Sequence, residues 1–186
     1  MNETTNFLKD AKSLISETGF NTSNIWYHGT SSALVESIQK NGLKRSGDKA
    51  IQAAAQKTMA TIGNTYSQTV EPVFLTQSAE LAFYWAQQTV RNRSVRIDGE
   101  EKPAVVTVTL PDDINKKVKP DVGAAGLLMI QEGEDYLMKV MSIYSENGIT
   151  PPEINLMKAD RLDYLHKLGM AYLDVDIDSK YVSLLT

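Results

Sequence analysis

Apolar residues recur at intervals of three and four along much of the chain, the spacing that places side chains on one face of a helix. The first stripe runs from Phe7 to Ile15 and predicts an amphipathic N-terminal helix over about residues 4–17, which Gly19 ends. Further stripes predict five more helices: from Ser31 or Ser32 to Asn41, after Asp48, over residues 79–91, from Gly133 to Asn147, and from Pro151 to about Leu168.

Short runs rich in β-branched and aromatic residues predict strands between these helices, at residues 25–28, 73–76, 104–110, 171–177 and 181–185. The run at 104–110 is the clearest, because almost every position is β-branched and a proline bounds each end. The helices and the scattered strands do not alternate regularly, so we expect a mixed α+β fold rather than a parallel sheet with crossover helices. The sequence also contains neither the glycine-rich Rossmann motif nor a Walker A loop.

Length and composition narrow the function classes. The 186 residues suit one domain, and the net charge of −4 argues against a generally basic surface for nucleic acid. There is no cysteine, which excludes disulfides, cysteine nucleophiles and thiolate metal sites. We find neither a secretory signal nor an apolar run of membrane-spanning length, so no membrane partner is expected. We expect a cytoplasmic protein, or an effector that is delivered into a target cell.

Histidine is the first candidate for chemistry. The chain has two histidines, too few for a histidine-rich metal site, so no metal is expected. His28 ends a predicted strand at Gly29, where a side chain and backbone N–H groups can meet a ligand together. The alternative is a strand-end histidine that bonds a loop carbonyl. His166 lies on a predicted helix, where we expect a partly exposed residue without a functional role.

Aromatic residues are the second candidates. Phe83, Tyr84 and Trp85 follow one another on a predicted helix, so their rings point in different directions and at least one leaves the core face. A ring that borders a cleft can stack on a flat heteroaromatic ligand. For any single ring, packing beneath the adjacent loop is the simpler interpretation.

Charged pairs are the third candidates, although most of them must be solvated. Lys44 and Arg45 can meet a phosphate, with a solvated pair as the default. Asp174 and Asp176 share one face of a predicted strand. If that face lines a cleft, one carboxylate can stabilise a developing positive charge; otherwise the two face water.

Three stretches together resemble the ADP-ribosyltransferase superfamily: "YHGTSSALVESIQKNGL", "VFLTQSAELAFYWA" and "AVVTVTLP". The arrangement is similar to small bacterial members, including rifamycin-modifying, toxin and phage transferases, and to the RNA 2′-phosphotransferases, which share the fold. The likeness covers roughly residues 25–110 and the tail "VDIDSKYVSLL". It implies a split mixed or antiparallel β-core flanked by helices, in a single domain over 1–186 with a helical insertion at about 120–168.

The resemblance also assigns roles to residues around a bound NAD. His28 matches the first-motif histidine, which bonds the adenosine ribose, and Gly29 matches the residue whose backbone holds the nicotinamide carboxamide. Thr30 follows it, as in many members. Phe74 falls at the second-motif tyrosine and keeps a ring for stacking without the hydroxyl. Tyr84 falls near a second tyrosine that stacks on nicotinamide in the poly-ADP-ribose polymerase branch.

Two further assignments complete the expected site. Arg45 joins the NAD-binding residues as the candidate for a phosphate contact. The third motif residue of the family is usually a glutamate on a late strand, and Asp174 is the acid that this strand offers here. The other candidates for the third motif acid are Glu132, Glu134, Glu153, Asp112 and Asp113.

The resemblance implies an enzyme that cleaves the nicotinamide–ribose bond of NAD and transfers ADP-ribose to a protein, nucleic acid or small-molecule acceptor. His28, Tyr84 and Asp174 are the expected catalytic residues, and NAD is a consumed substrate. Two alternatives stay open, an RNA 2′-phosphotransferase and a catalytically inactive module that binds NAD or ADP-ribose. A toxin or effector role implies an antitoxin or immunity protein as a further partner.

Overall fold

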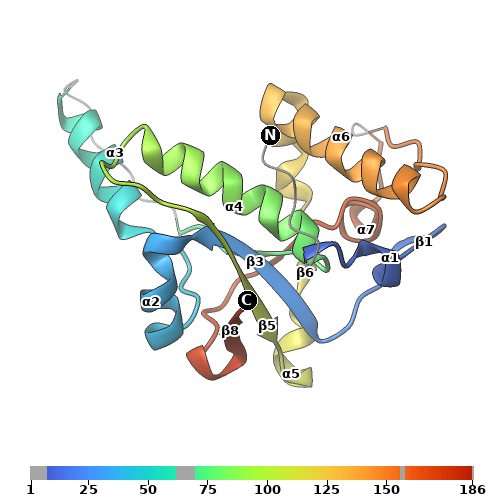
Figure 1. The fold of residues 1–186 in the computed structure, drawn as a ribbon, viewed down its shortest axis with the longest axis horizontal. Coiled ribbons are helices and arrows are strands. Elements are labelled where there is room, and N and C mark those ends of the chain that lie inside the picture. The colour runs from blue at the N-terminus through green and yellow to red at the C-terminus, as the bar shows by residue number, and fades with distance from the viewer. Residues whose placement is uncertain (1–7, 62–69, 156–157, 186) are drawn as a thin grey trace.

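The computed structural model describes residues 8–61, 70–155 and 158–185, apart from the side chain of Glu132, and contains two three-stranded antiparallel sheets (Figure 1). The first sheet has the order β3 (Ile25–Ser31), β5 (Pro103–Thr109) and β8 (Val182–Leu184). The second has the order β4 (Val73–Leu75), β7 (Ala171–Leu173) and β6 (Lys119–Pro120). A bridge between Tyr27 and Thr76 joins β3 to β4, so the two sheets meet along these strands. Helices beside antiparallel sheets confirm the predicted α+β fold class.

Helix α4 (Ala79–Ser94) lies against the first sheet, and its close approach accounts for the glycine of the YHGT stretch. A Cβ atom at Gly29 would stand 2.0 Å from the carbonyl oxygen of Ala82 and 2.5 Å from the nitrogen of Ala86. Real side chains never come so close, so only glycine lets α4 approach β3 to this distance. In Figure 1, α4 lies next to β3 and β5.

Helix α2 (Ser32–Asn41) begins and ends as predicted. The Ser31 side chain accepts a hydrogen bond from the backbone N–H of Ala33, which is an N-cap. At the other end Gly42 has a φ of 78°, a conformation that other residues rarely adopt. Helix α3 (Lys49–Thr61) follows, and Asp48 caps it by accepting from the N–H of Ile51.

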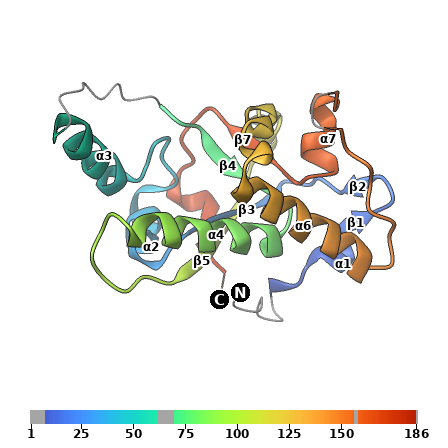
Figure 2. The ribbon, with the colours of Figure 1, turned by 90° about the horizontal axis from the view of Figure 1, so that it is seen from above.

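Residues 122–166 form a mainly helical region beside the second sheet, within the range predicted for an insertion (Figure 2). It contains the 3-10 helices η2 (Val122–Ala125) and η3 (Leu127–Met129), then α6 (Gln131–Glu146) and α7 (Arg161–His166). A core that includes Leu128, Tyr136 and Tyr144 joins these helices to Leu81 of α4. A second core fills the space around the sheets with Trp26, Val106, Val108, Leu173 and Ile177.

The predicted N-terminal helix is wrong over residues 9–10 and 15–17, and residues 4–7 lie outside the described residues. Helix α1 spans only Ala11–Leu14, and the chain continues as β1 (Ile15–Ser16), which pairs with β2 (Gly19–Phe20). Ile15 and Phe20 face each other in this hairpin and are both buried. Burial of this pair by tertiary contacts therefore overrides the helical spacing.

Three other boundaries also differ from the predictions. Residues 151–155 are not helical, and α7 begins only after Asp160, which forms a reciprocal capping box with Asp163. β7 stops at Leu173 instead of residue 177. The stretch after β5, for which no helix or strand was predicted, holds the short helix α5 (Asp112–Asn115) and strand β6. Among the described residues, no helix has the length and apolar character needed to cross a membrane.

Candidate functional site

A cavity of about 380 Å³ opens beside the line where the two sheets meet. Strand β3 contributes His28, Gly29 and Thr30 to its wall, and the β4 side contributes residues 71–74. The remaining walls come from α2, the loop 42–48, the first turn of α3 and the last turns of α4. This volume falls in the range of roughly 300–1,000 Å³ that is usual for small-molecule sites.

The imidazole of His28 is held in one orientation at this cavity. Its Nδ1 lies 2.8 Å from the carbonyl oxygen of Phe74, across the junction between β3 and β4. A carbonyl can only accept, so Nδ1 carries the proton and Nε2 of the neutral ring is left as an acceptor. Burial lowers the pKa of His28 below its usual value, with the Phe74 carbonyl acting in the opposite direction. The prediction that the strand ends at His28 is wrong, because β3 continues to Ser31. The alternative bond to a loop carbonyl is replaced by a bond to a carbonyl of strand β4, and the same histidine also lines the cavity.

Two other predicted contacts lie at the same cavity. Thr30 is buried in the wall next to Gly29. The Phe74 side chain is 46% exposed, an unusual state for a large apolar ring in a strand, and it borders the cavity. His28, Gly29, Thr30 and Phe74, which the YHGT and VFLT stretches singled out, are thus brought together.

Tyr84 lies elsewhere. Its ring packs 5.3 Å from that of Trp85 and 5.4 Å from that of Tyr136, measured between centroids, in the core shared by α4 and α6. It is not among the described residues that line the cavity. The side of α4 that carries this tyrosine is covered by the helical region 122–166, whereas the last turns, with Thr89, Asn92 and Arg93, reach the cavity.

Of the predicted charged residues, Asp174, Asp176 and Arg45 lie outside the cavity wall. Asp174 forms an ion pair with Lys119 at 2.9 Å, and both side chains are about half exposed. Arg45 donates its backbone N–H to Asp176 at 2.9 Å, and its side chain lies 3.7 Å from the same carboxylate. The Arg45 N–H, followed by the nearby Lys44 ammonium, lowers the pKa of Asp176. Of the two cations, Lys44 lines the cavity and Arg45 does not.

The other described candidates for the third motif acid also lie away from the cavity. Asp112 and Asp113 form the exposed first turn of α5, beyond the far end of β5. Glu134 on α6 and Glu153 before α7 are exposed and do not line the cavity. Glu132 begins the same helix as Glu134, but its side chain lies outside the described part of the chain.

Sequence reasoning missed two acids that do line the cavity, Asp48 and Glu71. Asp48 was considered only as the residue before a predicted helix, and Glu71 was not singled out. The available signal was the position of Glu71, two residues before a predicted strand that carries a motif ring. Residues at such strand entrances are held by the sheet while their side chains face a cleft.

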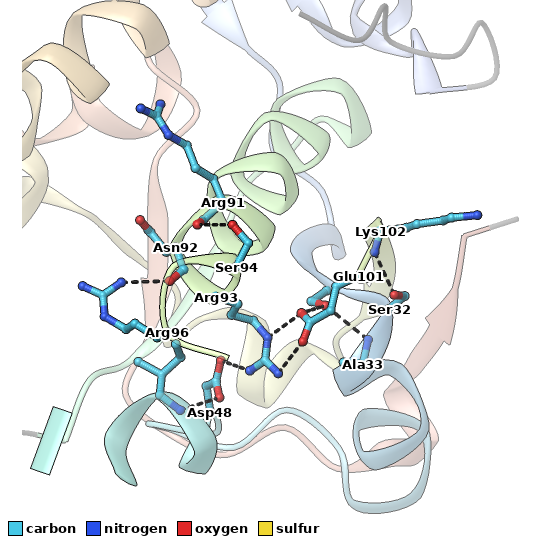
Figure 3. A network of polar contacts seen from close by, with 12 residues as sticks. Ser32, Ala33, Asp48, Arg91, Asn92, Arg93, Ser94, Arg96, Glu101 and Lys102 are labelled. Atoms are coloured by element: carbon cyan, nitrogen blue, oxygen red, sulfur yellow. Dashed lines mark hydrogen bonds and ion pairs between the residues drawn. The ribbon is translucent and has the colours of Figure 1, made fainter. Parts of the chain in front are cut away.

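Arg93 organises the wall at the α4 end of the cavity (Figure 3). Its side chain is 5% exposed and contacts two carboxylates: Nη1 lies 2.5 Å from Asp48, and Nε and Nη2 lie 2.6 and 2.9 Å from Glu101. Glu101 also accepts from the Ser31 hydroxyl, which ties the arginine to the end of β3. Hydrogen bonding to Arg93 lowers the pKa of Glu101, and hydrogen bonding to Glu101 raises that of Arg93. The pairing fixes the start of α3 against α4.

No family model matches this chain, and neither the curated proteins nor the solved structures contain a match. Among the residues that the structure describes, no group of three or more histidine, aspartate or glutamate side chains is arranged to hold a metal ion. The cavity and the motif residues that line it are therefore the features of this protein that bear on its function.

Proposed function

We propose that this protein is an NAD-consuming ADP-ribosyltransferase. Support comes from His28, which stands where the two sheets meet with its ring fixed by the Phe74 carbonyl, next to an exposed Phe74 ring in a cavity of about 380 Å³. The resemblance expects a split β-core, a histidine that meets the adenosine ribose and a ring that stacks on nicotinamide. A neutral imidazole with Nε2 as an acceptor suits a ribose hydroxyl, which donates.

Binding in this site would orient the dinucleotide before any bond breaks. Phe74 would stack on the nicotinamide ring, and His28 would hold the ribose at the other end. With the reacting ribose fixed, the loss of neutral nicotinamide is promoted by orientation and by a nearby negative charge. Tyr84 has no part in this version of the site, because its ring belongs to the core shared by α4 and α6.

The RNA 2′-phosphotransferase has less support. That reaction needs several free cations to hold phosphate groups. Of the described residues that line the cavity, only Lys44 and Arg93 are cationic, and Arg93 is already engaged by Asp48 and Glu101. The inactive binding module draws support from one observation: Asp174, the acid expected on the late strand, is paired with Lys119 outside the cavity.

One assay on the purified protein tests this choice. We expect incubation with NAD labelled in the nicotinamide ring to release nicotinamide, and His28→Ala to lower both NAD binding and release by about tenfold or more, because a hydrogen bond to a ribose hydroxyl is lost. His166→Ala is the matched control: this histidine lies near the Phe20 carbonyl in the helical region and should leave release unchanged.

The outcomes separate the three functions. Binding of NAD without release of nicotinamide would support the inactive module. Release that requires a 2′-phosphorylated RNA would support the phosphotransferase. If His28→Ala and His166→Ala behaved alike, the proposed site would be wrong.

A further inference from the structure

We infer that Glu71 is the carboxylate that faces the reacting ribose, in place of the acid expected on the late strand; this inference rests on the proposed function. Glu71 lines the cavity from the residues just before β4, three positions before Phe74. The ring that would stack on nicotinamide and this carboxylate therefore come from the same short segment.

The backbone of Glu71 is fixed from both sides. Its N–H donates to the Ser46 hydroxyl at 2.7 Å, and its carbonyl accepts from the Ser46 N–H at 3.1 Å. These two bonds attach the entrance of β4 to the loop that precedes α3. The side chain of Glu71 therefore starts from a backbone position that is fixed at the cavity, which limits where its carboxylate can reach.

Two described acids line the cavity, and Glu71 is the one whose side chain is not already engaged by another residue. Asp48, the other acid in the wall, accepts from Arg93 and caps α3. The side chain of Glu71 has no hydrogen-bond or ion-pair partner within the described part of the chain. An acid that is saturated by a buried arginine has little negative charge left to offer a cation, whereas an unpaired one keeps its full charge.

The acids of the late strand are engaged elsewhere. Asp174 is paired with Lys119, and Asp176 with Lys44 and the Arg45 backbone. Neither is among the described residues that line the cavity. Using one of them would first require breaking these contacts.

The reaction assigned to this carboxylate balances without any further reagent. The bond between the ribose C1′ and the nicotinamide nitrogen breaks, and its electron pair leaves with nicotinamide, which becomes neutral. The positive charge passes to the ribose as an oxocarbenium-like centre, beside the Glu71 carboxylate. A nucleophile, water or the acceptor, then bonds to C1′, and its proton passes to Glu71 or to solvent.

The test compares Glu71→Gln with Asp174→Asn, two changes that each remove one charge and keep the side-chain shape. We measure the rate of nicotinamide release at saturating NAD and, separately, the Kd for NAD. We expect Glu71→Gln to lower the rate about 100-fold or more with a Kd within about threefold of wild type, since the lost charge acts on the transition state. Asp174→Asn should keep both values.

Further readouts distinguish a chemical role from a structural one. Glu71→Asp, which keeps the charge on a shorter side chain, should recover part of the lost rate. Thermal unfolding of all variants should coincide, because Glu71 is exposed. A wild-type protein that releases no nicotinamide would overturn the proposed function and this inference with it. An active wild type with an equally active Glu71→Gln, or a loss confined to Asp174→Asn, would overturn the assignment of Glu71 alone.

Discussion

Helices α3 and α6 have similar predicted patterns and very different attachments to the molecule. Both carry an apolar stripe at helical spacing. α6 buries Tyr136, Val140, Ile143 and Tyr144 completely or almost completely, whereas α3 has no buried residue along its 13 positions. In Figures 1 and 2, α3 lies at one edge of the molecule and α6 lies beside α4.

The difference follows from the size of the side chains in each stripe. The stripe of α3 holds two alanines beside Ile51 and Met59, and that of α6 holds two tyrosines with valine and isoleucine. Burial stabilises in proportion to apolar area, so small side chains dock a helix weakly. The start of α3 is instead attached by polar contacts, from Asp48 to Arg93 and from Gln52 to the Ser46 carbonyl. A periodic pattern thus predicts that a helix forms, and the volume of its residues decides how firmly the helix is held.

The largest effect is expected from Tyr136→Ala in α6. The ring is fully buried against Tyr84 and Trp85, and its hydroxyl donates to the Leu168 carbonyl. Removing it leaves a cavity and an unsatisfied carbonyl, so the free energy of unfolding should fall by about 3–5 kcal/mol in urea titrations. Met138→Ala, on the exposed side of the same helix, should change it by less than about 0.5 kcal/mol. Similar losses for both would show that α6 is not held by its buried face.

A smaller and local effect is expected from Asp48→Ala at the start of α3. The change removes the N-cap and one partner of Arg93, which keeps its two bonds to Glu101. Loss of a cap costs about 0.5–2 kcal/mol. Hydrogen exchange should accelerate in the amides of α3 and stay unchanged in those of α6. Asp98→Ala, an exposed residue after α4, is the control, and equal acceleration in both helices would contradict the difference in attachment.

Elements that depend on local signals were predicted well. Ser31 and Asp48 cap their helices as expected, and Gly42 ends α2. One local signal was overlooked, because α7 starts at the capping box of Asp160 and Asp163 instead of at the prolines. The other error occurs where distant contacts decide: Ile15 pairs with Phe20 in a hairpin that packs in one core with Tyr144 and Leu168. Local spacing contains no information on these partners.

The candidate site also contains residues that the sequence predicts and residues whose placement depends on distant contacts. His28, Thr30 and Phe74 lie at one cavity because they stand on the neighbouring strands β3 and β4, where the two sheets meet, a relation that the motif stretches already implied. Tyr84 was expected there too, yet its side of α4 is covered by a helical region whose packing the sequence does not reveal. Glu71 was not singled out because its place in the cavity wall depends on contacts with Ser46, 25 positions earlier.

The smallest expected effect is on the pH dependence of stability, which should respond to a change at the cavity and not to one in the packed helical region. Burial lowers the pKa of His28 in the folded protein below the ordinary value of 6.5, so the unfolded chain binds more protons in the window between these two values. Stability should therefore fall as the pH falls from about 6.5 through that window, with a slope from this residue of at most about 1.4 kcal/mol per pH unit.

His28→Asn removes the titrating group and should flatten this part of the curve in urea titrations between pH 8 and pH 5. Tyr136→Ala should shift the whole curve down and keep the slope, because the tyrosine does not titrate in this range. An unchanged slope in His28→Asn would mean that the imidazole at the cavity is as free to accept a proton as it is in the unfolded chain.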